Sequence, residues 1–513
     1  MKSETKKKKK LLNILLSIFY VIFTISFTTI FITSIFRDGC VYYKLNHLVY
    51  FFVSVLILLI WYFLYKIICN IFYKIDEKKK RIIYIVTFFL IALLLIFFFI
   101  VLDVPLGWDY DVIYSQARSF ALTGQRTKLA VYPEYFQYFP NNISIFLIEF
   151  IVIKLAMIFS IENFVPVLEM FNGLLIFLAI LLIFLYCKKM YDDKKAYFSL
   201  LVSISFIPLF LYLPIFYSDT FSVIFLPLIL YIYCYIDFNK LKCKDIILSI
   251  ILILIIYIGL KIKVTLLFIL FGLFIEFIKK HNLKRTIIIC LVIFVSFFVL
   301  NLCWNTAIQN HFKVNDYGKI PITHWIMMGI EDPKYDNSSR NSYGGYNLRD
   351  YELTQSYPHG EDSIDMHIKE IKKRIKSYSI IELLDYYNKK NVNIWGDGSY
   401  YSAIKLNIGN KNKSNNIQKL LSGEDKYKVL LYIEEGVQIA FLYILVYSGI
   451  YSLKNKKYDF SYIHIPILVI LFFLTIWEGR SRYLYNYIPL FIITITYYID
   501  KINIFFKFRR KKK

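Results

Sequence analysis

A single carboxylate, Asp219, lies in the segment IPLFLYLPIFYSDTFSVIFLPLILYIY, between two apolar runs that are each long enough to be membrane helices. A carboxylate near the middle of a bilayer costs roughly 2.5–3.5 kcal/mol on insertion scales, so such residues usually face a polar cavity. The alternative is a hairpin turn at Ser218, Asp219 and Thr220, in which the Asp caps the next helix. The positions of the other polar clusters favour the cavity.

Three further polar clusters fall at turns between apolar runs. A carboxylate in such a cluster can take the proton from an attacking hydroxyl. Lys and Arg can hold a phosphate and stabilise the charge that develops on it as it leaves. A lipid carrier would bring such a phosphate to the membrane surface, where these cations would lie. The clusters are Asp109 and Asp111 in GWDYD, Lys261 and Lys263 in GLKIKVT, and Glu478, Arg480 and Arg482 in WEGRSRYLY.

Each cluster also has a purely structural interpretation. Asp109 can simply start a helix, and Lys261 and Lys263 can extend toward lipid headgroups. These two lysines nevertheless run against the tendency of basic residues to stay in the cytoplasm, so topology alone does not explain them. We therefore expect Asp109, Asp219 and the basic residues to share one face.

The composition predicts that a membrane positions these residues. The chain has 513 residues, of which 58% are hydrophobic, and a mean hydropathy of +0.52, so it is not a soluble globular protein. Its 45 Tyr and 47 Phe suffice for aromatic belts at both membrane interfaces. The net charge of +24 lies largely in short segments between apolar runs, where it fixes orientation and does not indicate nucleic-acid binding.

A helix needs about 20 apolar residues to cross the hydrocarbon. We expect an all-α polytopic membrane protein with about twelve transmembrane helices. Placing the Lys/Arg-rich connections in the cytoplasm puts both termini there, which requires an even number of crossings. The predicted spans are 11–36, 48–73, 82–102, 166–187, 197–216, 220–237, 245–260, 264–279, 285–303, 429–452, 461–477 and 483–499.

Segment 141–160 is surplus to this count and carries Glu149 and Lys154 in its apolar run. We predict an interfacial or re-entrant helix on the outer side; the alternative is that it spans while a neighbour does not. Two longer regions are expected outside. One is the loop 103–140, whose residues 112–121 suit a helix lying in the interface, and the other is a folded domain over 304–428, between spans nine and ten.

Several classes of site are disfavoured. The seven cysteines show no paired spacing, which argues against a disulfide framework or a zinc site. The histidines form no HExxH, and no GxxxxGK loop is present to power transport by ATP. We predict no cofactor; outer carboxylates could hold a divalent metal, but no ligand spacing indicates one.

The order of GWDYDVIYSQA, EYFQYFPNNI, FYSDT, GLKIKVT and RSRYLY resembles the integral-membrane glycosyltransferases of the GT-C class. Among them, the chain is similar to the bacterial relatives of protein mannosyltransferases and lipid A aminoarabinose transferases. HWIMMGI, YGGYNLRD and WGDGSYYS in the outer region also resemble relatives from Gram-positive bacteria. The resemblance covers most of residues 100–500.

The resemblance implies roles for individual residues. The first-loop Asp of the family is catalytic and falls on Asp109, and a second acidic residue of the site falls on Asp219. The Lys of a Lys-x-Thr turn falls on Lys263, and the Arg before Tyr-Leu-Tyr falls on Arg482. From their places in the polar clusters, Lys261 and Arg480 are predicted to bind the donor phosphate together with Lys263 and Arg482. The predicted supporting residues are Asp111, Tyr138, Asn141, Asn142 and Glu478.

The sequence thus predicts a membrane glycosyltransferase of the cell membrane, with its active site on the outer face. It would pass a sugar from a polyprenyl-phosphate carrier to a cell-envelope glycan, teichoic acid, protein or lipid, by inverting transfer to a hydroxyl. The alternatives are a transporter or flippase of lipid-linked saccharide and a non-enzymatic scaffold. The predicted regions are a two-span extension (1–81), a catalytic membrane core (82–303), the outer domain (304–428) and the C-terminal helices with a basic tail (429–513).

Overall fold

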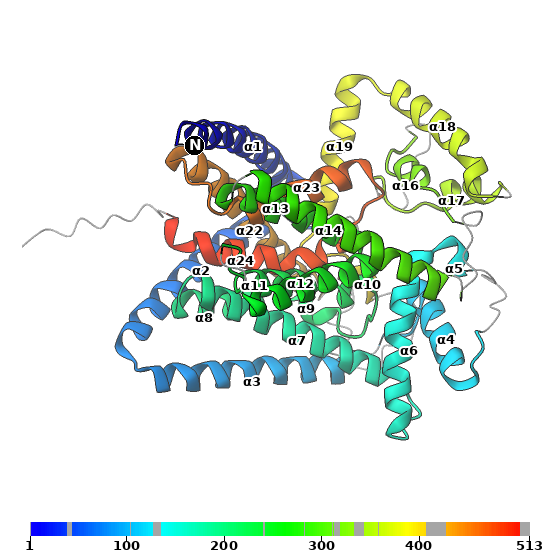
Figure 1. The fold of residues 1–513 in the computed structure, drawn as a ribbon, viewed down its shortest axis with the longest axis horizontal. Helices are drawn as coiled ribbons and strands as arrows, with labels where there is room; N and C mark the ends of the chain where they lie inside the picture. Colours follow the sequence, from blue (N-terminus) through cyan, green and yellow to red (C-terminus); the bar gives the residue numbers. More distant parts are fainter. Residues whose placement is uncertain are drawn as a thin grey trace, which may run out of the picture.

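The fold is built from helices, most of them long and apolar (Figure 1). The computed structural model describes residues 2–37, 44–102, 104–126, 135–239, 242–281, 283–309, 311, 319–332, 343–357, 359–406 and 427–502. No strand occurs among these residues, which confirms the predicted all-α class.

Eight stretches of helix in the described residues are long and apolar enough to cross a membrane. In the first three, only 28% of the most apolar window is buried inside the protein, so most of these side chains face outward, as lipid contact requires. The helices are α1 (Lys2–Phe36), α2 (His47–Lys74), α3 (Glu77–Val101), α6 (Ile143–Ile158) with the preceding η1 (Pro140–Asn142), α7 (Val165–Met190), α12 (Cys243–Ile262), α14 (Leu283–Trp304) and α22 (Tyr427–Asn455).

Polar residues at the turns fix where several of these helices begin. Asn46 accepts a hydrogen bond from the backbone of Leu48 at the start of α2, and Asp76 accepts one from Lys79 at the start of α3. Each satisfies a backbone N–H that the helix cannot satisfy itself. The boundaries predicted from apolar length therefore agree with those of the structure to within a few residues at these ends.

The predicted count of twelve spans is not confirmed, because five of the predicted spans fold as short or broken helices. Pro208 separates two helices within 197–216, and Pro466 lies inside a helix of 16 residues. The pieces are α8 (Asp193–Ser205) and α9 (Pro208–Leu211), α10 (Ser218–Phe221) and α11 (Phe225–Tyr233), η2 (Val264–Phe268) and α13 (Ile269–Lys280), α23 (Ser461–Ile476), and η5 (Ser481–Tyr487), α24 (Ile488–Tyr498) and η6 (Ile499–Lys501).

The N-terminal helices pack on the C-terminal ones. Two glycines of α22 allow this close approach: a Cβ on Gly436 would lie 2.6 Å from Val53 of α2, and one on Gly449 would lie 2.3 Å from Thr24 of α1. Such distances are below those of real contacts, so larger residues there would push the helices apart. The predicted extension 1–81 therefore shares its core with α22.

Segment 141–160 forms α6, which runs across the direction of α3 and α7 in Figure 1, beside α4 (Trp108–Thr123). Ile113, Ala117 and Ala121 of α4 are buried in a hydrophobic cluster that includes residues of α6. These apolar positions, which suit an interface-lying helix, are thus covered by protein. With η1, α6 is also long enough to span, so its interfacial placement stays a prediction.

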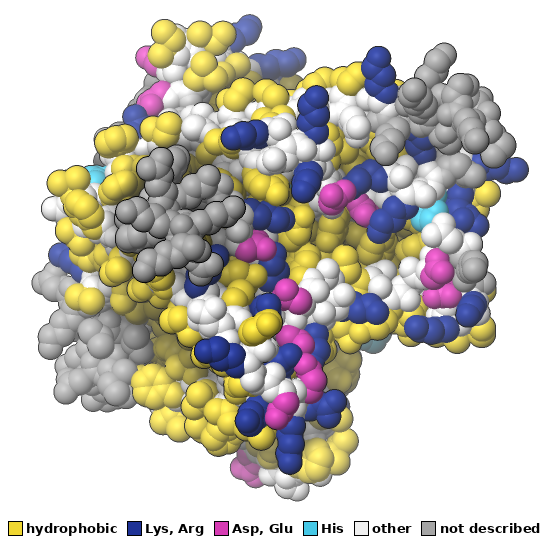
Figure 2. Space-filling view, turned by 90° about the vertical axis from the view of Figure 1, so that its left-hand side faces the viewer, with side chains coloured by type: hydrophobic (Ala, Val, Ile, Leu, Met, Phe, Trp, Pro, Cys, Tyr) yellow, Lys and Arg dark blue, Asp and Glu magenta, His cyan; other side chains and the backbone are white. Residues whose placement is uncertain are grey.

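Basic residues gather at one end of the molecule. Figure 2 views the side that carries the N-terminus and the α2–α3 turn, and shows many Lys and Arg side chains there. Ion pairs join the turns: Lys80 lies 3.8 Å from Asp193, and Lys195 lies 3.1 Å from Asp500. The opposite ends of α3, α12 and α24 lead to the polar clusters of the sequence.

The described part of 304–428 is folded. It contains α16 (Ile322–Met328), α17 (Leu348–Gln355), η4 (Glu361–Ser363), α18 (Ile364–Ser377), α19 (Ile380–Trp395) and α20 (Ser402–Lys405). Arg374, 1% exposed, donates to both carboxylate oxygens of Asp350 at 2.6 and 2.9 Å and to the carbonyls of Met327 and Ile330. A buried, fully bonded guanidinium of this kind fixes α16, α17 and α18 together.

Candidate active site

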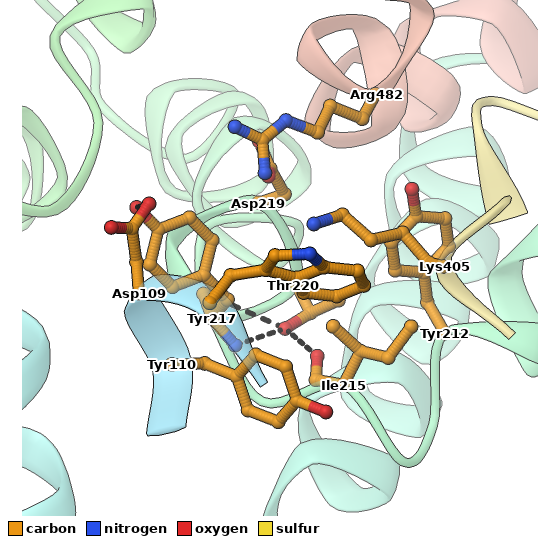
Figure 3. Close-up of a pocket in the computed structure, with 10 residues that line it drawn as sticks. Asp109, Tyr110, Tyr212, Ile215, Tyr217, Asp219, Thr220, Lys405 and Arg482 are labelled. Carbon is orange, nitrogen blue, oxygen red and sulfur yellow. Dashed lines mark hydrogen bonds and ion pairs between the residues drawn. The ribbon is translucent and has the colours of Figure 1, made fainter. Parts of the chain in front are cut away.

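A pocket lies where the broken helices meet the region 304–428 (Figure 3). Figure 3 shows the Arg482 guanidinium, the Asp219 carboxylate and the Lys405 ammonium directed toward the same space, with Asp109 at its edge. The lining comes from α4, the α9–α10 turn, α20 and η5. It comprises Trp108, Asp109, Tyr110, Tyr212, Ile215, Tyr217, Asp219, Thr220, Lys405 and Arg482.

Asp109 lies in the first turn of α4, and two phenols hold its carboxylate. The Tyr135 hydroxyl donates to Oδ1 at 3.0 Å, and the Tyr217 hydroxyl donates to Oδ2 at 3.3 Å. Behind them, Asn142 donates to the Tyr135 oxygen at 2.6 Å. Each carboxylate oxygen keeps a further lone pair, so Asp109 can still accept a proton from a third partner.

Asp219 lies in the first turn of α10 and is 2% exposed. Its Oδ1 pairs with the Lys263 ammonium, and its Oδ2 lies 3.9 Å from the Arg482 guanidinium. It does not cap the helix: Thr220 performs that role, since its hydroxyl accepts from the Tyr217 backbone at 3.1 Å. Asp219 therefore lines a polar pocket and does not cap the helix.

Arg482 approaches the pocket from η5 and lies between aromatic rings. Its guanidinium carbon is 5.8 Å from the ring centre of Tyr217 and 5.2 Å from that of Tyr483. Its Nε is buried and has no hydrogen-bond partner among the described residues. A guanidinium that is charged and only partly bonded can still bind an anion, in two-pronged fashion.

Lys405 was not among the predicted site residues, yet its ammonium points into the pocket, 3.1 Å from the ring centre of Trp108. The side chain is nearly buried, and this burial lowers the pKa of Lys405 well below its usual value. The Arg482 charge lowers it further, whereas Asp109 and Asp219 act in the opposite direction. An added anion would favour the charged ammonium.

The motif WGDGSYYS positions Lys405. Asp397 accepts hydrogen bonds from the backbone N–H groups of Ser399 and Tyr401, which folds the loop tightly before α20. The Ser481 hydroxyl, at the start of η5, also donates to Asp397. Burial raises the pKa of Asp397, and these hydrogen bonds oppose that shift. One carboxylate thus joins the loop that carries Lys405 to the element that carries Arg482.

Trp108 has φ +49°, a left-handed conformation that costs a non-glycine residue energy. Gly107 precedes it as the N-cap of α4 and provides no side chain for capping. The strain aims the indole at Lys405 while Asp109, the next residue, turns toward the phenols. Strain of this kind is frequent at binding sites.

Eight predicted site residues lie outside the pocket lining: Lys263 and Asn142, whose contacts are given above, and six others. Lys261 donates to Asn301 of α14 at 2.7 Å. Glu478 accepts hydrogen bonds from the Tyr346 backbone at 3.1 Å and from the Tyr483 hydroxyl at 2.6 Å. It thus joins η5 to the segment that contains Tyr346. The others are Arg480, which donates to the Tyr346 carbonyl; Asp111, which accepts from Ser115; Tyr138, whose carbonyl accepts from Ile320; and Asn141, which donates to Asn142.

Among the described residues, no group of three or more His, Cys, Asp or Glu side chains is arranged to hold a metal ion. The site is therefore described by its two carboxylates, its cations and the aromatic rings around them.

A family model described as "Conserved hypothetical integral membrane protein" matches residues 5–502. The chain belongs to this family. It is an integral membrane protein, in agreement with its apolar helices. No curated protein and no solved structure matches it.

Proposed function

We propose that this protein is a membrane glycosyltransferase that takes a sugar from a polyprenyl-phosphate donor and passes it to a hydroxyl of a cell-envelope acceptor. The observation that carries the proposal is the pocket itself. It combines Asp109, a carboxylate with free lone pairs, with two cations, Arg482 and Lys405, that can bind a phosphate.

In the proposed reaction, an acceptor hydroxyl attacks the anomeric carbon of the donor sugar. Asp109 takes the hydroxyl proton as the new C–O bond forms, and the bond between the anomeric carbon and the phosphate oxygen breaks with its electron pair on that oxygen. Arg482 and Lys405 stabilise the charge of the leaving lipid phosphate, which is greater in the transition state than in the donor. Attack from the face opposite the phosphate inverts the anomeric centre.

Asp219 has a supporting role in this scheme. Its carboxylate is neutralised by Lys263 and lies 3.9 Å from Arg482, so it is a poor base and a good positioning group. It holds the guanidinium at the pocket and reduces the repulsion between neighbouring cations. Lys263, which the sequence assigned to phosphate binding, serves here by fixing Asp219.

The end of the molecule at which the pocket lies supports an outer active site. The basic turns that join α2 to α3 and α7 to α8 favour the cytoplasm, which supports the proposal that both termini lie there. The pocket lies at the other ends of α3 and α12. A prenyl tail in the outer leaflet of the cell membrane would bring its phosphate to this level.

A flippase or transporter of lipid-linked saccharide is the second candidate, and the broken helices favour it. Interrupted helices commonly line transport pathways, and here the α9–α10 turn, α10 and η5 border the pocket. The two proposals differ in what they require of Asp109. Transfer needs it as a base toward the acceptor hydroxyl, whereas translocation leaves the bond between the sugar and the lipid phosphate intact.

The test compares lipid-linked and envelope saccharides in cells that lack the gene and carry either wild type, Asp109→Asn or Asp111→Asn. Asp111 is a matched control, since it lies in the same turn of α4 but outside the pocket lining. We expect the donor to accumulate and the glycosylated acceptor to disappear with Asp109→Asn, a loss of about 10²–10⁴-fold in transfer. Normal transfer by Asp109→Asn would refute the proposal, and a donor retained on the inner leaflet would favour the flippase.

A further inference from the structure

The corner between α18 and α19 exposes a group of large apolar side chains that the pocket does not use. Ile380, Ile381 and Leu384, in the first turns of α19, are 77%, 76% and 66% exposed. In Figure 1 this corner lies at the edge of the molecule, away from the other helices. Exposed apolar side chains gathered in this way indicate a surface that binds something.

The contacts between α19 and α1 show where the α18–α19 corner lies relative to the membrane-spanning stretch of α1. Asn388 of α19 donates to Thr33, inside the apolar stretch Lys10–Phe36, at 3.2 Å. One turn earlier, Asp385 pairs at 3.1 Å with Arg37, the residue that directly follows this stretch. The first turn of α19 therefore lies at the level where the α1 span ends, which is the border of a membrane.

The apolar surface of α1 continues onto this corner. Ile32 and Phe36, in the last turns of α1, are 49% and 72% exposed, as expected of lipid-facing residues. Successive helix positions separated by three or four residues share one face, so Leu384 and Ile381 continue the face of α19 that Asn388 presents to α1. Lipid around the end of α1 would thus also reach Ile381 and Leu384.

Helix α18 adds the charge that such a contact needs. Its exposed side is basic, with Ile375 at its edge, while Arg374 and His367 face the interior. A basic helix face next to exposed Ile and Leu is typical of segments that lie on anionic headgroups. The exposed lysines are Lys369, Lys372, Lys373 and Lys376.

We propose that the α18–α19 corner is a membrane anchor: Ile380, Ile381 and Leu384 enter the lipid interface beside α1, and the lysines of α18 bind anionic headgroups. The occupant of this surface is the bilayer on the side of the pocket. Helix α19 leads directly from the anchor to Trp395, which packs on Phe27 of α1, and then to the Asp397 loop. The anchor thereby steadies the loop that places Lys405 in the pocket, and it does so whichever reaction the pocket performs.

The test places the photoreactive amino acid benzoylphenylalanine at single positions of the full-length protein in nanodiscs that contain phosphatidylglycerol. The test positions are Ile381 and Leu384. Phe36 is the lipid-facing reference, and Glu352, exposed on α17, is the aqueous reference. After illumination, lipid adducts are measured by mass spectrometry.

We expect adducts at Ile381 and Leu384 within about threefold of those at Phe36, and at least fivefold above those at Glu352. Yields equal to those at Glu352 would overturn the proposal. So would crosslinks to a second copy or to another part of this chain, because the surface would then be covered by protein.

A double variant, Ile381→Ser with Leu384→Ser, tests the link to the pocket. Both side chains are exposed, so the substitution removes no core packing. We expect amide exchange of residues 395–405 to become at least threefold faster in nanodiscs and to stay unchanged in detergent without anionic lipid. Equal effects in both media would show that these side chains serve the protein fold and not an anchor.

Discussion

The ion pair between Asp219 and Lys263 should dominate the stability of the pocket, and removing one partner should cost far more than removing a helix cap. Both side chains are nearly buried: Lys263 is 11% and Asp219 3% exposed. The substitution Asp219→Asn keeps the shape of the side chain and removes its charge. It leaves the Lys263 ammonium without its carboxylate, next to the Arg482 guanidinium.

The magnitude follows from burial. Breaking a buried pair by removing one partner costs about 3–5 kcal/mol, because an uncompensated charge remains inside the protein. Loss of a helix cap costs about 1 kcal/mol, and Thr220 already caps this turn. Lys263→Met should also be destabilising, since it strands the carboxylate. The double variant should lose about 2–3 kcal/mol less than the sum of the two single losses.

Equilibrium unfolding in mixed detergent and dodecyl sulfate micelles measures these free energies. Lys261→Met is the matched control, because this lysine lies two residues away and, among the described residues, contacts the exposed Asn301 and aromatic rings. Its loss should be below about 1 kcal/mol. If the two single losses simply add in the double variant, the pair does not hold the pocket and the reasoning fails.

Three further predictions concern the pocket and the outer region. Lys405→Met should lower turnover with purified donor by about 10²–10³-fold, whereas Lys405→Arg should keep part of the activity because it keeps the positive charge. Equal losses in the two variants would argue against stabilisation of the leaving phosphate by the charge of Lys405. Arg482→Lys should raise the donor concentration needed for half-maximal rate and reduce turnover, with the dependence on acceptor concentration unchanged. Steady-state kinetics with each substrate varied in turn measure both effects. A change in acceptor dependence alone would place Arg482 in the acceptor half of the site. Burial lowers the pKa of His324 and of His367 to about 4. Between pH 6.5 and 4 the unfolded chain therefore binds more protons than the folded protein. The stability that these buried neutral histidines allow above pH 6.5 should be lost as the pH falls through this window. Amide-exchange protection of α16 and α18, corrected for intrinsic rates, should therefore fall from pH 7 to 4.5, and His367→Gln should flatten this dependence.

The long helices could be predicted from the sequence because apolar length alone defines them. Hydropathy does not report whether the backbone hydrogen bonds run without interruption, so it cannot distinguish α7 from the broken pair α8 and α9. Pro208 indicates the break between that pair, and Pro466 indicates the irregularity of α23. Interrupted backbone at membrane depth is tolerated where it lines a cavity, and the α9–α10 turn, which follows the break at Pro208, lines the pocket.

The charged residues of the pocket were largely predictable, and its aromatic ones were not. Asp109, Asp219 and Arg482 stand out because few charges interrupt the apolar runs around them, and the structure brings them to one pocket. Tyr135 and Tyr217 do not stand out in a chain with 45 tyrosines. Their role depends on the α4–α10 geometry, which is a tertiary property.

Lys405 could have been found from its motif. WGDGSYYS contains an Asp between two glycines, a pattern that suits a tight loop whose backbone bonds to the carboxylate. Such a loop aims the residues that follow it, and Lys405 is the first cation after it. The outer region was assigned no part in the site, which is why this lysine was missed.

The two carboxylates of the pocket have unequal surroundings, and this inequality is the strongest argument for assigning the chemistry to one of them. Asp219 pairs with Lys263 and lies near Arg482, so protonating it would leave two cations unopposed. Asp109 contacts two neutral phenols, and among the described residues it forms no ion pair. A base must accept a proton without disrupting its site, and only Asp109 meets this condition. In the proposed reaction, Asp219 would hold the cations in place while Asp109 changes its charge during each turnover.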